Sequence, residues 1–133
     1  NICTAIVGEL LKMGHEAKYM LWLDDVTPLK AGIMDDDHAF NMNKFKKVKV
    51  LYVDDFFKSE VGKMPSQADI KIAFEILNHR YNNPNLITII SSEKTIKDLL
   101  DIDEAIGSRV YEKTKEYSVN IGRDKTKNFR MKE

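Results

Sequence analysis

Two adjacent carboxylates, Asp54 and Asp55, follow the apolar run VLYV at residues 50–53. Such a run predicts a strand buried on both faces, and ligands bind beyond the carboxyl ends of parallel strands. There one carboxylate can hold Mg²⁺, directly or through water, while the other polarises an attacking water. We assign the first role to Asp54 and the second to Asp55. A strand that meets a solvated loop gives the same pattern, and so does the acidic site of a receiver domain.

Two other polar clusters follow predicted strands, Asp24-Asp25 and Ser91-Ser92-Glu93. The carboxyl ends of parallel strands share one edge of a sheet, so we expect these clusters to converge with Asp54 and Asp55. A hydroxyl or amide in the second cluster could contact both an attacking water and a γ-phosphate. A serine-rich turn that introduces the next helix would explain the same residues.

Several basic residues could contact phosphates or could simply be solvated. Arg109 follows Gly107 and Ser108 on a predicted short helix, where it is either an exposed charge or an arginine finger inserted into a neighbouring subunit's site. Lysines at residues 44–49 and a basic tail at residues 123–132 leave the same two explanations open. No residue is assigned to nucleic acid.

Composition narrows the class of protein. The 21 Lys and Arg residues balance 21 Asp and Glu residues, so no global field attracts nucleic acid. No apolar run approaches the roughly 20 residues of a membrane span. A single cysteine excludes an internal disulfide, and the three histidines do not share zinc-ligand spacing with it or with one another. We therefore expect a cytoplasmic protein without a membrane segment.

The elements that must position these residues alternate along the chain. Apolar periodicity predicts helices at residues 2–13, 66–81, 95–100 and 102–112, and a less regular helical connection at 26–47. Strands are predicted at residues 17–23, 48–53, 86–90 and 117–121. Ser66 and Asp69 have capping-box spacing, and Ile70, Phe74, Leu77 and Tyr81 follow on one helix face. Strands separated by such helices imply an α/β class with three layers and a parallel sheet.

The order of these segments resembles the AAA+ core of DnaC/DnaI-type replicative helicase loaders, which are primosome components of Gram-positive bacteria and their phages. The similarity spans nearly the whole chain. It rests on VLYVDDFFK (50–58), QAD (67–69), FEILNHRY (74–81), IISSE (89–93) and IGSRV (106–110). The resemblance implies that Asp54 and Asp55 are the Walker B acids, that Ser92 or Glu93 stands at sensor 1, and that Arg109 is the arginine finger. Arg80 falls in the family's recurrent Asn-x-Arg-Tyr segment.

The chain departs from the family in two places. The family usually has Asn at sensor 1, and no Gly-x-x-x-x-Gly-Lys-[Ser/Thr] phosphate loop occurs in these 133 residues. We interpret residues 1–133 as a partial AAA+ domain, from Walker B to the arginine finger and a last strand, that begins inside a longer protein. It should lack the first, central strand of the P-loop NTPase sheet and the phosphate loop. We therefore expect an unfilled central slot, or a partner strand, beside residues 50–53.

The resemblance implies ATP-dependent loading of the replicative DNA helicase during replication initiation. ATP and Mg²⁺ would be the cofactors, and the helicase, single-stranded DNA and further copies of the ATP-bound chain would be the partners. An IstB-like transposition helper ATPase has a similar core. A non-catalytic DNA- or helicase-binding module on an ATPase scaffold is the alternative from another class, and a receiver domain ranks below it.

Overall fold

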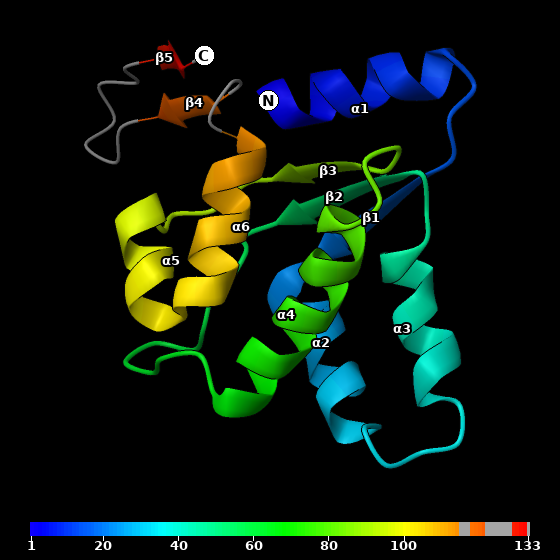
Figure 1. Cartoon of the computed structure of the whole chain (residues 1–133), viewed down its shortest axis with the longest axis vertical. Helices are drawn as coiled ribbons and strands as arrows, with labels where there is room; N and C mark the ends of the chain where they lie inside the picture. The colour runs from blue at the N-terminus through cyan, green and yellow to red at the C-terminus, as the bar shows by residue number, and fades with distance from the viewer. Residues whose placement is uncertain (115–117, 122–128, 133) are drawn as a thin grey trace.

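A three-stranded parallel sheet lies between two layers of helices. The computed structural model describes residues 1–114, 118–121 and 129–132. The sheet has the order β1-β2-β3, with β1 (Ala17–Leu21), β2 (Val50–Asp54) and β3 (Ile87–Ile90). One side carries α2 (Trp22–Ala31), α3 (His38–Lys46), α4 (Gln67–Tyr81), α5 (Ile96–Ile102) and α6 (Glu104–Thr114), and α1 (Ile2–Lys12) crosses the other (Figure 1). The predicted α/β class and its three layers are confirmed.

Strand β2 occupies the middle of this sheet. It pairs with β1 from Ala17↔Val50 to Leu21↔Asp54, and with β3 from Val50↔Ile87 to Val53↔Ile90. The predicted unfilled slot beside residues 50–53 is therefore wrong, because the crossovers through α2–α3 and through α4 bring a strand against each edge of β2. In the part of the chain that the structure describes, the unpaired edges of this sheet belong to β1 and β3.

The first strand is two residues shorter than predicted, because α2 begins directly at Trp22. The Asp25 carboxylate accepts a hydrogen bond from the Leu21 backbone N–H at 2.9 Å, which gives this amide a partner where the chain leaves the sheet. Asp24 and Asp25 also lie in the first turn of α2, where negative charge is favourable. These two acids, predicted to follow the strand directly, therefore lie in the first turn of a helix.

Helix α4 begins with the predicted capping box. The Ser66 side chain accepts from the Asp69 N–H, and the Asp69 carboxylate accepts from the Ser66 N–H. Asp69 also receives Lys30 of α2 at 2.8 Å, so this start is tied to a second helix. The buried face differs from the predicted one: Ile70, Phe74 and Tyr81 are half-buried, and the buried positions are Asp69, Ile72, Ala73, Ile76, Leu77 and Arg80. The reason is that α2, α3 and α6 all pack on this helix and bury a broader face.

The last predicted strand does not join the parallel sheet. Instead β4 (Ser118–Ile121) pairs antiparallel with β5 (Phe129–Lys132), a strand that falls within the predicted basic tail. Part of that tail, residues 123–128, lies outside the described residues. None of the described helices has the length and apolar character of a membrane span.

The hydrophobic core lies between the sheet and the five helices of one face. Its largest fully buried side chains include Trp22, Phe56 and Phe57. Helix α1 is bound more loosely, since none of its eleven residues is buried. The two faces of the sheet are therefore covered unequally.

A buried guanidinium connects the amino ends of β2 and β3. Arg80, at the end of α4, is only 2% exposed, and burial lowers its pKa to about 10, so it stays charged at neutral pH. It donates to six acceptors, none of which is a carboxylate: Thr88 Oγ1 and the carbonyl oxygens of Phe45, Lys46, Val48, Lys49 and Ile87, at 2.7–3.3 Å. One side chain thus holds the end of α3 and the start of two strands together.

Replacing Arg80 with Met should lower the free energy of unfolding by about 3 kcal/mol or more, because several buried carbonyl groups would lose their donor. Arg80→Lys should lose much of the same stability, since one ammonium cannot reproduce the planar fork. Urea unfolding measures both changes. Lys71→Met, at an exposed position of the same helix, is the control, and an Arg80→Met variant as stable as this control would contradict the assignment.

Candidate functional site

The carboxylate of Asp54 is held from both sides at the carboxyl edge of the sheet. Ser91, just beyond β3, donates from its hydroxyl to Asp54 Oδ1 at 2.5 Å. Tyr19, on β1, donates from its hydroxyl to Asp54 Oδ2 at 2.7 Å. The expected convergence of strand ends is therefore confirmed for Asp54 and Ser91. Tyr19, on β1, adds a second hydroxyl donor to Asp54.

These contacts shift the ionisation of the groups involved. Burial by itself would raise the pKa of Asp54, but the hydrogen bonds from Ser91 and Tyr19 oppose it, and the pKa is lowered. The hydrogen bond to Asp54 raises the pKa of Tyr19 to about 12. Asp54 is thus ionised, and Tyr19 keeps its proton, throughout the neutral range.

Asp55 lies in a strained turn. Its φ is +53° and that of Phe57 is +64°, and few side chains adopt this left-handed conformation. The Asp55 N–H donates to Ser91 Oγ at 3.3 Å, and the Phe56 N–H donates to the Ser91 carbonyl at 2.9 Å. The Asp55 carboxylate lies 3.8 Å from Lys58 and is 41% exposed, so water can reach it.

Buried aromatic rings hold this turn in place. Phe56 and Phe57 are both fully buried and stack with centroids 4.2 Å apart. Each also meets the ring of Trp22 edge to face, at 5.1 and 5.5 Å. Burial of three large side chains offsets the backbone strain of about 1–3 kcal/mol for each residue in such a conformation. The sequence predicts a loop here but gives no sign that its two phenylalanines enter the core.

The predicted sensor residues Ser92 and Glu93 lie in the turn after β3. The Ser92 hydroxyl donates to the Phe56 carbonyl at 2.7 Å and accepts from the Lys94 N–H at 3.0 Å. It therefore links the turn after β3 to the turn that contains Asp55. Glu93 is exposed. Of the three residues in this cluster, Ser91 is the one that contacts Asp54.

Arg109 lies on α6 against α4, and no described contact joins it to Asp54 or Asp55. Its Nε donates to Asn78 Oδ1 at 2.8 Å, and its guanidinium lies 5.0 Å from the Phe74 ring centroid and 5.7 Å from that of Tyr81. A finger that acts on a neighbouring subunit does not need to contact its own acid pair, so this placement leaves that role untested.

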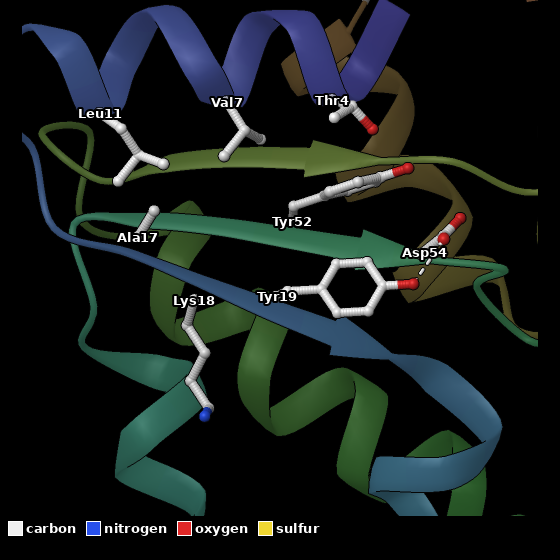
Figure 2. Close-up of a pocket in the computed structure, with 8 residues that line it drawn as sticks. All are labelled: Thr4, Val7, Leu11, Ala17, Lys18, Tyr19, Tyr52 and Asp54. Atoms are coloured by element: carbon white, nitrogen blue, oxygen red, sulfur yellow. Dashed lines mark hydrogen bonds between the residues drawn. The ribbon is translucent and has the colours of Figure 1, made fainter. Parts of the chain in front are cut away.

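A groove of about 460 Å³ runs between α1 and strands β1 and β2 and ends at Asp54 (Figure 2). Val7, Leu11 and Ala17 line it along its length, whereas the hydroxyl of Tyr19 meets Asp54 at its polar end. Thr4, in the first turn of α1, lies at the same end as Tyr52 and Asp54 (Figure 2). The amino end of α1 therefore faces the acidic edge of the sheet.

The site contains few charged side chains that could coordinate a metal ion. Within the described residues, no group of three or more His, Cys, Asp or Glu side chains is placed to hold a metal ion. Each Asp54 oxygen that accepts one hydroxyl keeps a further lone pair. Asp54 can therefore still take part in binding a hydrated Mg²⁺, which retains most of its water ligands in such sites.

Sequence reasoning missed Tyr19, although its strand position opposite Tyr52 follows once the β1–β2 register is known.

The left-handed backbone at Asp55 can be tested by two substitutions that both remove its ion pair with Lys58. Asp55→Ala should be less stable than Asp55→Gly by about 1 kcal/mol, since a Cβ is disfavoured at positive φ. Urea unfolding of the two variants measures the difference. An Ala variant at least as stable as the Gly variant would show that the turn is not strained as described.

The contacts of Asp54 also predict a pH dependence. Because its folded pKa is lowered, Asp54 stabilises the folded state above the unfolded value of about 3.9, and this contribution disappears as pH falls through the lower folded pKa. Asp54→Asn should therefore cost stability at pH 7, and its difference from wild type should shrink below about pH 4. Urea unfolding in EDTA at several pH values tests this, with exposed Asp36→Asn as control. A gap that stays constant with pH would contradict the account.

Sequence comparison finds two relatives in Bacillus subtilis (strain 168). The chain is 35% identical to uncharacterized protein YqaM over 128 residues, which cover 94% of this chain and 40% of that protein. It is also 35% identical to phage-like element PBSX protein XkdC over 127 residues, covering 91% of this chain and 45% of that protein. No protein-family model matches. The chain thus spans less than half the length of these curated relatives.

Solved structures share the fold. A structure described as a DNA replication initiation factor superposes with a TM-score of 0.65 and 20% identity, over 83% of this chain and 33% of the other. The DnaC helicase loader superposes with a TM-score of 0.61, also at 20% identity, over 74% of this chain and 58% of the loader. The chain therefore has an α/β fold similar to that of the DnaC helicase loader.

Proposed function

We propose that residues 1–133 belong to the AAA+ ATPase core of a protein that loads the replicative DNA helicase. The main support is the pair Asp54-Asp55 at the end of the central strand of a DnaC-like fold, with Ser91, just beyond β3, against Asp54. This is the place where a Walker B pair is expected. The function as a loader rests on the likeness in fold and on the sequence resemblance together.

In this proposal the two acids have different tasks because their surroundings differ. Asp54, ionised and oriented by two hydroxyl groups, helps to hold Mg²⁺. When bound, Mg²⁺ would neutralise charge on the phosphate oxygens. Asp55, one residue further and open to water, orients the attacking water and accepts its proton.

The phosphates would lie between these acids and the amino end of α1. That end carries the positive end of the helix dipole, which suits an anion, although the Thr4 N–H is already capped by the Asn1 side chain. Thr4, in the first turn of α1, lines the same groove as Asp54 (Figure 2), so this end of the helix lies beside the acid. No phosphate-loop motif occurs in the 133 residues, and we propose that a segment outside them provides it.

Arg109 is the proposed arginine finger of an ATP-bound oligomer. To reach a neighbouring site it would exchange its contacts with Asn78, Phe74 and Tyr81 for the neighbour's phosphates. Ser92 and Glu93 remain the proposed sensor residues, on the turn that supports Asp55. The helicase and single-stranded DNA are the proposed partners, in the cytoplasm.

ATP hydrolysis by the full-length protein, with and without single-stranded DNA, tests this proposal. Asp55→Asn should reduce turnover by about 100-fold or more, because it removes the group that accepts the proton of water. Asp36→Asn, at an exposed loop position, should leave turnover unchanged. Wild-type protein that hydrolyses no ATP under either condition would rule out the catalytic function and favour a non-catalytic module that binds DNA or the helicase.

A further inference from the structure

Tyr19 is a solvent-exposed residue with a directed hydrogen bond. The residue lies on β1 and is 53% exposed, so water could hydrate its hydroxyl group fully. Its hydroxyl instead donates across to Asp54 on the neighbouring strand at 2.7 Å. Figure 2 shows the ring lying along the sheet with its oxygen directed at the carboxylate.

The tyrosine is itself held in place. Tyr19 and Tyr52 are register partners, and their rings meet edge to face at 5.4 Å with an interplanar angle of 71°. This packing limits the directions in which the Tyr19 hydroxyl can point. With Ser91 on the other oxygen, the Asp54 carboxylate is fixed at two points, by a residue of β1 and by the residue that follows β3.

We propose that Tyr19 is a positioning residue for Asp54, which orients the carboxylate for a hydrated divalent cation. The inference rests on the proposed function, because it names the cation as the ligand of the same site. A carboxylate held at one oxygen can still rotate, whereas one held at both presents its remaining lone pairs in a fixed direction. Binding then does not have to order the side chain.

Tyr19→Phe removes the hydroxyl and keeps the ring that packs on Tyr52. Tyr111→Phe, at an exposed position of α6, is the matched control. NMR couplings of Asp54 report its χ1 rotamer without metal, and Mn²⁺ titration reports cation binding through broadening of the Asp54 signals. We expect one rotamer in wild type and in Tyr111→Phe, and rotamer averaging with severalfold weaker Mn²⁺ binding in Tyr19→Phe.

The two readouts separate the failure of this inference from that of the proposed function. Tyr19→Phe with an unchanged rotamer and unchanged Mn²⁺ affinity would overturn the positioning role. Rotamer averaging in Tyr19→Phe, with no Mn²⁺ effect at Asp54 in either protein, would support the positioning and contradict the proposed metal role of Asp54.

A measurement on the wild-type chain avoids any loss of folding in the variant. The hydroxyl proton of Tyr19 should exchange slowly with water and show a nuclear Overhauser contact to the Asp54 methylene protons. Exchange as fast as that of the Tyr111 hydroxyl, without such a contact, would overturn the inference.

Discussion

The guanidinium of Arg80 is the constraint on which the geometry of the sheet depends. It binds carbonyl oxygens just before β2 and at the start of β3, so it ties together the amino ends of both strands. With these ends fixed, the parallel register runs to Val53↔Ile90, and Ser91 follows next to Asp54. A structural residue at the amino ends of the strands thus supports the register that places Ser91 against Asp54 at their carboxyl ends.

The turn after β2 has a strained backbone, and it carries the residue proposed to orient the attacking water. Asp55 and Phe57 have left-handed backbones, and the buried pair Phe56–Phe57 together with Trp22 stabilises them. The turn is also fastened to the end of β3 through Ser91 and Ser92. Consequently the Asp55 carboxylate stays open to water while Phe56 and Phe57 are fully buried, an arrangement suited to orienting water at a fixed place.

Sequence reasoning predicted the features with local signals: the buried strand before Asp54, the capping box of α4 and the alternation that gives an α/β class. It could not predict features that depend on which strands become neighbours. The pairing of β2 on both edges, the Tyr19–Asp54 hydrogen bond and the separate β4–β5 pair are of this kind. The buried role of Arg80 was also invisible, because a charged residue near a helix end is usually solvated.

In the proposed function, Asp54 and Asp55 serve a nucleotide bound beside the amino end of α1. A crystal structure of the full-length protein with Mg²⁺ and a non-hydrolysable ATP analogue tests it most directly. Mg²⁺ should lie next to Asp54, directly or through one water, with the terminal phosphates between α1 and Asp55. A nucleotide bound elsewhere, with Asp54 facing no metal, would contradict it.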